Sequence, residues 1–173
     1  NAPAAADTQS QKLAEQRQQY ELLRDRIRTA PANRLNGLQD DIQAMADYPL
    51  HSYLRYELIN RQINYRYRSK IRTFLQDTKG LPIRTLILKK WLRYLAENHY
   101  QTVFLKEYEP GLGTELLCRQ LHLSRRKNGA DAAWHEQVAV IWLSGSSQPE
   151  ACDPVLYYWR IKGQLTPELA IQR

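Results

Sequence analysis

The chain of 173 residues has 43% hydrophobic residues, 25% charged residues, 7 glycines and a net charge of +7 at pH 7. This composition is typical of a helix-rich globular protein and excludes a disordered or collagen-like chain. The longest apolar runs, Val138 to Leu143 and Val155 to Trp159, are far shorter than the roughly 20 residues of a membrane-spanning helix, so no membrane span is expected.

Residues 1–7 are small and Ala-rich, and we expect them to be disordered. They are typical of a chain whose export signal has been removed, and a remnant of cloning is the alternative. Residues 8–173 are expected to form a single helical-repeat domain. Because the last residues, from Leu165 onward, show no polar capping pattern, we expect this domain to be part of a longer superhelix.

Apolar residues recur at intervals of three and four in the first third of the chain, which predicts helices. The first helix is predicted from about Thr8 to Ala30, with Thr8 or Ser10 as its cap and Pro31 as its end. A second helix ends before Pro49, which opens the third. The inward positions are predicted to be Leu13, Gln16, Tyr20, Leu23, Ile27, Leu35, Leu38, Ile42, Met45, Leu50, Tyr53, Leu54 and Leu58.

The helical spacing of apolar residues continues through the middle of the chain. A fourth helix is predicted over about Arg66 to Asp77, and Gly80 and Pro82 then mark a stop and a new start. The fifth helix has the strongest apolar pattern and ends at Asn98-His99, and a short sixth helix lies near Tyr100 to Glu107. The large inward residues of the fifth helix are Ile83, Ile87, Trp91, Tyr94 and Leu95.

The last part of the chain predicts four more helices. Thr114 is expected to cap the seventh, which ends at Asn128-Gly129, and the ninth and tenth begin near Pro149 and Thr166. The eighth and ninth carry the inward residues Trp134, Val138, Ile141, Trp142, Cys152, Val155, Leu156 and Trp159. Roughly ten helices joined by short turns predict an all-α superhelix of paired antiparallel helices, an α-solenoid, without a strict repeat period.

The two cysteines, Cys118 and Cys152, fit a structural disulfide in an oxidising compartment better than a metal site, since no histidine lies at ligand spacing. Two buried free thiols are the alternative. Asp131 and His135 stand one helical turn apart, but two ligands make a weak metal site. We therefore expect no metal and no cofactor. The four tryptophans lie on apolar stripes, which favours core packing over sugar stacking.

The stretch from Trp142 to Asp153 resembles a motif of the soluble lytic murein transglycosylases that reads Trp-Leu-x-Gly-x-Ser-Gln-Pro-x-Ala-Cys-Asp. Upstream, the Asp-Tyr-Pro-Leu element at 47–50 and the Glu-Gln-Arg element at 15–17 resemble further family motifs. In that family a cysteine precedes the Ser-Gln-Pro stretch by one helical hairpin, as Cys118 does here. The resemblance covers nearly the whole chain in order, except that His51-Ser52 replaces a second Tyr-Pro-like element.

The resemblance implies a periplasmic protein whose parent enzyme cleaves the MurNAc–GlcNAc bond of peptidoglycan with formation of a 1,6-anhydro-muramyl end. In the family a Glu followed by Ser acts as acid and base. No glutamate of this chain is followed by Ser, and no Gly-Leu-Met-Gln element occurs. We therefore expect a non-catalytic N-terminal segment, with no catalytic residue of its own, that serves a C-terminal catalytic domain and restricts glycan access to it.

The stretch from Arg55 to Arg93 is strongly basic. A basic interaction surface is predicted at Arg61, Arg66, Arg68, Lys70, Arg72, Lys89 and Lys90. Such a surface attracts the carboxylates of peptidoglycan peptides, and a solvated positive face without a partner is the plainer interpretation. The tyrosines Tyr65 and Tyr67 between the arginines raise a nucleic-acid alternative, but an exported protein rarely meets nucleic acid, so we expect none as a partner.

Three functions remain open from the sequence. The first is a segment of a peptidoglycan lytic transglycosylase, with peptidoglycan, its own catalytic domain and cell-wall proteins as partners. The second is a stand-alone periplasmic module that binds proteins. The third is a basic helical repeat that binds nucleic acid. A disulfide favours the first two, because disulfides persist in oxidising compartments.

Overall fold

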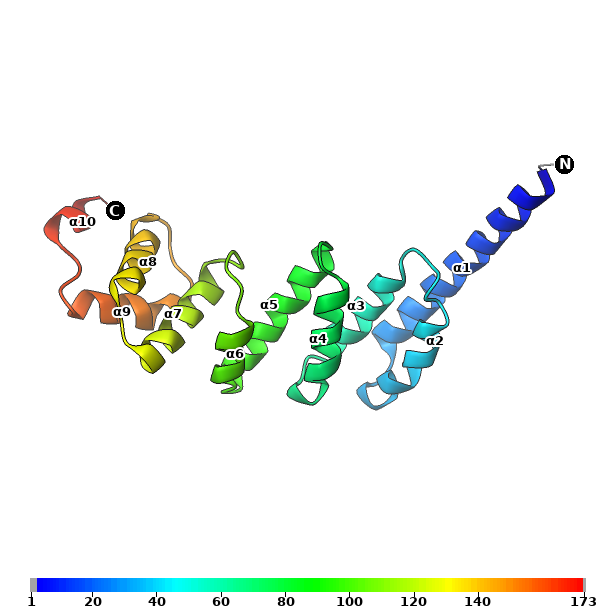
Figure 1. Ribbon diagram of the computed structural model, residues 1–173, viewed down its shortest axis with the longest axis horizontal. Coiled ribbons are helices and arrows are strands. Elements are labelled where there is room, and N and C mark those ends of the chain that lie inside the picture. The colour runs from blue at the N-terminus through cyan, green and yellow to red at the C-terminus, as the bar shows by residue number, and fades with distance from the viewer. Residues whose placement is uncertain (1–2, 173) are drawn as a thin grey trace. The chain divides into compact units, whose positions relative to one another are not determined.

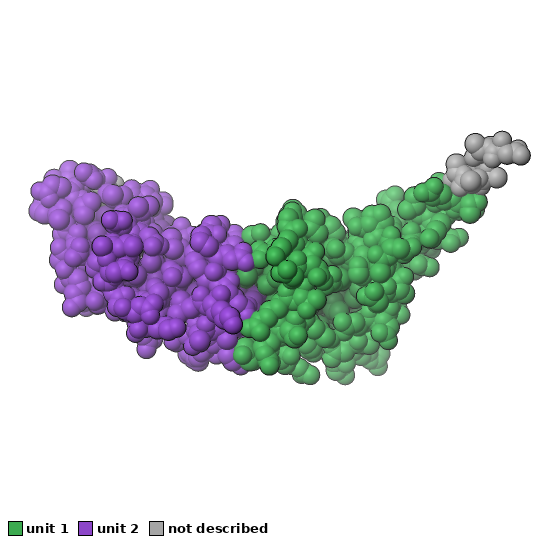
Figure 2. Space-filling view, viewed as in Figure 1, with its two compact units in different colours: residues 1–88 green, residues 89–173 purple. Residues whose placement is uncertain are grey.

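The computed structural model describes the backbone of residues 3–172 and the side chains of residues 8–172. These residues form ten α-helices and three short 3₁₀ helices, and no strand occurs among them (Figure 1). The chain divides into two compact units, residues 1–88 and residues 89–173 (Figure 2). The division falls inside one helix, α5 (Pro82–Glu97). The prediction of a single domain over residues 8–173 stays a prediction.

Helix α1 (Pro3–Thr29) begins five residues before the expected start. Thr8 and Ser10 therefore lie inside the helix, and the prediction that one of them caps it is wrong. The disorder expected for residues 1–7 falls partly outside the described residues, since residues 1 and 2 are not described and only the backbone of residues 3–7 is. Helix α1 ends where predicted, because Pro31 is fixed in extended backbone with a ψ of 152°.

Five further elements belong wholly to the first unit. They are η1 (Ala32–Leu38), α2 (Gln39–Gln43), α3 (His51–Arg61), η2 (Tyr65–Tyr67) and α4 (Arg68–Asp77). The predicted second helix is thus a 3₁₀ turn that continues into a short α-helix. Helix α3 packs against α1, α2 and α4.

The core of the first unit follows the predicted helical stripes. Tyr20, Leu23 and Ile27 are buried on one face of α1. The prediction of an inward position is wrong for Leu13, Leu50 and Tyr53, which are exposed. The partners of the three buried residues in the same cluster are Leu35, Leu38, Ile42, Met45, Leu54 and Leu58. The spacing of three and four places these residues on one side of each helix, so that burying the stripes removes most of the apolar surface from water.

The second unit contains the end of α5 and six more elements. They are α6 (Gln101–Glu107), α7 (Thr114–Asn128), α8 (Ala132–Leu143), η3 (Glu150–Cys152), α9 (Asp153–Ile161) and α10 (Pro167–Ile171). The side chain of Asp131 caps α8, and that of Thr166 caps α10. The expected cap at Thr114 is wrong, because Gly113 occupies the cap position with a φ of 101° that favours glycine.

The core of the second unit is built around tryptophans. Trp134 and Trp159 are buried together with Val138, Val155 and both cysteines. The Trp134 indole N–H donates to the carbonyl oxygen of Leu121 at 2.9 Å. Trp91 is also fully buried, whereas Trp142 is half-buried. The prediction of core tryptophans is therefore confirmed for three of the four, and Trp142 lies partly at the surface.

No helix within the described residues is both long and apolar enough to cross a bilayer.

Candidate functional site

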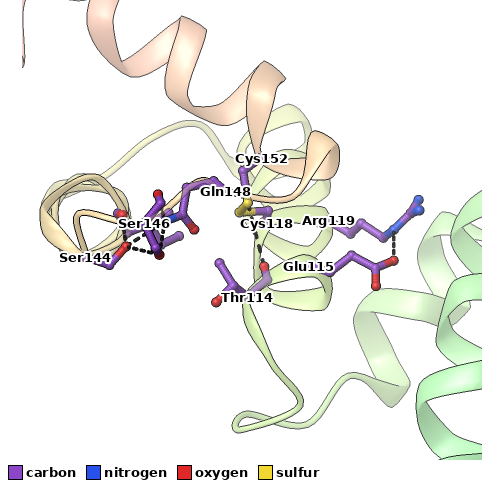
Figure 3. The surroundings of a disulfide bond; sticks show 9 residues. Thr114, Glu115, Cys118, Arg119, Ser144, Ser146, Gln148 and Cys152 are labelled. Atoms are coloured by element: carbon purple, nitrogen blue, oxygen red, sulfur yellow. Dashed lines mark hydrogen bonds and ion pairs between the residues drawn. A yellow bond between two sulfur atoms is a disulfide. The ribbon is translucent and has the colours of Figure 1, made fainter.

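The disulfide joins Cys118 of α7 to Cys152 of η3, with the two Cα atoms 4.9 Å apart (Figure 3). Both cysteines are fully buried, and Cys152 Sγ lies 3.9 Å from the carbonyl oxygen of Thr114 at the start of α7. The predicted pairing is confirmed. Helix α7 is thereby tied to the beginning of α9, across α8 and the loop that follows it.

The loop after α8 is held by its own polar side chains (Figure 3). Gln148 Nε2 donates to Ser144 Oγ at 2.6 Å and to the carbonyl oxygen of Ser146 at 2.9 Å. Ser144 Oγ donates in turn to the carbonyl oxygen of Ile141, the last turn of α8. The Ser-Gln-Pro stretch is thus a loop fixed by hydrogen bonds, and it leads directly into the disulfide at Cys152.

A pocket of about 410 Å³ lies between this loop, the end of α8 and one face of α9. It is lined by Trp142, Ser147, Gln148, Asp153, Leu156, Tyr157 and Arg160. No role of Tyr157 or Arg160 was predicted from the sequence. The available signal was the spacing of Asp153, Tyr157 and Arg160 at i, i+4 and i+7, which places three polar groups on one face of a helix.

Several carboxylates make contacts that stabilise the fold, and Glu115 is the first of them. Arg93 donates to both carboxylate oxygens of Glu115. Arg119 Nε donates to Glu115 Oε1 at 3.3 Å (Figure 3). The hydrogen bond from Arg93 is the largest of the effects that lower the pKa of Glu115. A glycosidic general acid needs the opposite, a carboxyl whose pKa an apolar cleft raises.

Glu107 and Asp41 also make structural contacts. Glu107 Oε2 accepts the indole N–H of Trp91 at 2.6 Å, which satisfies a buried donor. Asp41 forms an ion pair with Arg26 of α1 at 3.0 Å, at the surface. These arrangements stabilise helix packing and have no acid–base geometry.

The four histidines, at positions 51, 99, 122 and 135, lie far apart along the chain. In the part of the chain with described side chains, no three His, Cys, Asp or Glu residues gather closely enough to hold a metal ion. Asp131 Oδ1 accepts the backbone N–H of Trp134, so this carboxylate is a helix cap. Burial and the nearby Arg125 and Arg126 lower the pKa of His122, which therefore favours the neutral imidazole.

The predicted basic surface does not come together as one cluster. Arg61 to Arg72 lie in the first unit, whereas Lys89 and Lys90 lie in the second. Arg61 Nη1 donates to the carbonyl oxygens of Ile27 and Ala30 at 2.5 and 2.7 Å. Its charge is thus used at the C-terminal end of α1, where a helix dipole favours a cation.

Arg66, Arg68 and Lys70 lie against the rings of Tyr65 and Tyr67. The Arg66 guanidinium lies 5.0 Å from the ring centroid of Tyr67, and that of Arg68 lies 4.8 Å from the centroid of Tyr65. Lys70 Nζ donates to Gln39 Oε1 at 2.6 Å. The rings interleaved with the arginines are thus occupied by neighbouring cations. A role for this face in binding a partner stays a prediction.

Comparison with known proteins finds relatives of one kind. No family model matches the chain. The soluble lytic murein transglycosylases of Salmonella typhimurium and of Escherichia coli are each 27% identical to the chain over 164 residues, which cover 93% of the chain. Those residues make up only 24% of each relative, so the chain spans about a quarter of their length.

Solved structures agree with these relatives. The 70-kDa soluble lytic transglycosylase of Escherichia coli matches with a TM-score of 0.75 and 25% identity, over 93% of this chain and 26% of that one. An inactive mutant of the lytic transglycosylase Slt from Pseudomonas aeruginosa matches with a TM-score of 0.74 and 28% identity, over 90% of this chain and 25% of the other. The all-α helical-repeat fold expected from the sequence is confirmed. By sequence and by fold, the chain is similar to a helical segment of the soluble lytic murein transglycosylases.

Proposed function

We propose that the chain is a non-catalytic helical segment of a periplasmic peptidoglycan lytic transglycosylase. In this proposal the parent enzyme cleaves the MurNAc–GlcNAc bond and forms a 1,6-anhydro-muramyl end, and the active site lies in a separate catalytic domain. The helical segment frames that domain and restricts how glycan strands approach it. The observation that carries the proposal is the match to murein transglycosylases over 93% of the chain but 24% of the relatives.

The chemistry of the described residues supports a non-catalytic role. A lytic transglycosylase needs one carboxyl that first donates and then accepts a proton. Two arginines hold the pKa of Glu115 below its usual range, and no glutamate of the chain is followed by Ser. The carboxylates described above are engaged in caps, ion pairs and indole hydrogen bonds.

The disulfide supports the periplasmic location, because structural disulfides persist in oxidising compartments. Alkylation under denaturing, non-reducing conditions tests this point on protein purified from its native host. We expect no labelled thiol. Labelling of both Cys118 and Cys152 would contradict the periplasmic location and favour a reducing compartment.

Digestion of murein sacculi tests whether catalysis and control of glycan access lie in separate parts of the parent enzyme. We expect the 173-residue chain alone to release no 1,6-anhydro muropeptides. We expect the product of the complete gene to release them, and a version without residues 1–173 to act differently on intact sacculi than on short soluble glycans. A change confined to sacculi is expected because a segment that controls access matters only when the substrate is a network.

Two results would overturn the proposal. Release of anhydro muropeptides by the isolated chain would show that it carries catalytic residues. Absence of lytic activity in the complete gene product, in the presence of a folded helical segment, would favour the stand-alone periplasmic binding module instead.

A further inference from the structure

The pocket beside α9 combines one apolar wall with one polar wall. Its apolar wall consists of Trp142 from α8 and of Leu156 and Tyr157 from α9. Its polar wall consists of Ser147 and Gln148 from the loop and of Asp153 and Arg160 from α9. The volume of about 410 Å³ is within the range of sites that bind small molecules.

The aromatic side chains differ in how firmly they are held. The Trp142 indole N–H donates to the carbonyl oxygen of Leu169 at 3.4 Å, and its ring lies 6.1 Å from that of Trp159. The ring is thus anchored to the core on one side while it lines the pocket. Tyr157 is 65% exposed, so most of its ring is accessible from solvent. The two rings therefore offer one fixed and one accessible aromatic surface.

One polar side chain of the pocket, Gln148, is held in place, and two others are available to a ligand. Gln148 Nε2 is committed to Ser144 and Ser146, which fixes the amide and leaves its Oε1 atom as an acceptor for a ligand. Among the described residues, neither the Asp153 carboxylate nor the Arg160 guanidinium has a side-chain hydrogen bond or ion pair. The pocket thus presents hydrogen-bond acceptors from Gln148 and Asp153, and the N–H donors of the Arg160 guanidinium, beside an apolar surface.

We propose that this pocket binds a pyranose unit of an amino-sugar glycan. A pyranose has an apolar face of C–H groups that packs on an aromatic ring, and equatorial hydroxyl and acetamido groups that both donate and accept hydrogen bonds. Rings on one wall and an amide, a carboxylate and a guanidinium on the other match both properties.

Charge argues for a sugar over an anionic polymer. The lining carries one carboxylate, Asp153, and one guanidinium, Arg160, so that its formal charge is balanced. A nucleic acid requires a strongly positive surface for its phosphates, and the carboxylate here would repel them. A largely uncharged sugar is therefore the better ligand for this pocket.

The choice of an amino-sugar glycan rests on the proposed function, whereas the pocket itself does not. The pocket adds direct binding of the strand to a segment that was proposed only to restrict access. Four of its residues belong to the stretch that resembles the family motif, namely Trp142, Ser147, Gln148 and Asp153. Arg160 and the exposed ring of Tyr157 come from the rest of α9.

Binding of chitotetraose to the 173-residue chain tests the proposal, with backbone amide NMR shifts as the readout. We expect shifts at residues 142–160 and a dissociation constant in the millimolar to high micromolar range. Tyr157→Ala is expected to weaken binding about tenfold through loss of stacking, and Tyr157→Phe by less than about threefold. Tyr53→Ala, at another exposed tyrosine in the first unit, is the control and should leave binding unchanged.

A titration with a soluble stem peptide separates the sugar from the peptide part of peptidoglycan. Shifts caused by the stem peptide and none by chitotetraose would overturn the proposal, as would shifts that Tyr157→Ala leaves unchanged. Lytic activity of the complete gene product is a separate readout. Its absence would overturn the proposed function while chitotetraose binding at Tyr157 would still establish the pocket.

Discussion

Arg61, the last residue of α3, holds the C-terminal end of α1 through its Nη1 atom, which lies 2.5 Å from the carbonyl oxygen of Ile27. The same atom lies 2.7 Å from the carbonyl oxygen of Ala30. The last carbonyls of a helix have no partner within the helix, so this guanidinium satisfies two of them and complements the helix dipole. A residue that looks like part of a basic surface in the sequence is thus a tertiary cap.

Arg61→Gln should destabilise the first unit by about 1–2 kcal/mol, because hydrogen bonds from a charged donor to two carbonyls are lost. Arg66→Gln is the matched control, since Arg66 is exposed and its guanidinium packs on the ring of Tyr67. Urea unfolding followed by tyrosine fluorescence and by hydrogen exchange of α1 and α3 gives the comparison. Equal stability of the two variants would show that the cap contributes nothing.

Loss of the disulfide should destabilise the second unit by about 4 kcal/mol, because the bond closes a loop with a sequence separation of 34. The variant is Cys118→Ser with Cys152→Ser, and reduction of the parent chain is the second form of the same change. All four tryptophans lie in residues 89–173, so tryptophan fluorescence during urea unfolding reports on this unit alone. Hydrogen exchange in α1 to α4 serves as the control and should change little.

Acid should weaken the second unit through Glu115. Hydrogen bonds from Arg93, followed by the charges of both arginines, lower the pKa of Glu115 in the folded chain. A carboxyl with a lowered folded pKa contributes stability above its unfolded pKa of about 4.5, and this contribution is lost as the pH falls through the folded value. The side chain is partly exposed, so solvent screening limits the effect to roughly 0.5–1 kcal/mol.

Glu115→Gln should therefore lower stability at pH 7 and change it little at pH 2, measured by tryptophan-detected unfolding across that range. Glu136→Gln on the exposed side of α8 is the control. A loss of the same size at both pH values would contradict a role of the carboxylate charge.

His99→Gly should stabilise the second unit by roughly 0.5–1 kcal/mol. His99 follows α5 with a φ of 65°, and Tyr100 N–H donates back to the carbonyl oxygen of Leu95 at 2.9 Å, which is the geometry of a glycine C-cap. Glycine adopts this backbone without steric strain, although it gains entropy in the unfolded chain. Asn should give a smaller gain and Ala none, as judged by the midpoint of thermal unfolding.

Much of the fold was predictable because helix ends depend on residues close in sequence. Pro31 and Gly129 mark helix ends where the structure has them, and the apolar spacing of α8 correctly placed Val138 and Ile141 inside. The wrong predictions of helix caps also depend on residues close in sequence. Thr114 was expected to cap α7, but the preceding Gly113 adopts a left-handed backbone that takes the cap position.

The candidate site was less predictable. The motif from Trp142 to Asp153 indicated the family, and the two cysteines favoured a disulfide over two free thiols, but neither identified the pocket. Tyr157 gives no signal by itself, because a tyrosine at a helical spacing fits a core position as well as an exposed one. Only the packing of α8 against α9 makes it a wall of the same pocket as Trp142.

The sequence by itself determined which segments are helices, that two cysteines are available for one bond, and that the Glu-Ser pair of a lytic transglycosylase is absent. These properties depend on spacing within about one helical turn or on the identity of neighbouring residues. The tertiary structure alone decided that Arg61 caps α1 and that α8, the Ser-Gln-Pro loop and α9 border one open pocket. Such contacts join residues far apart in sequence, and they depend on turn geometry and on the packing of helix faces, which no local pattern specifies.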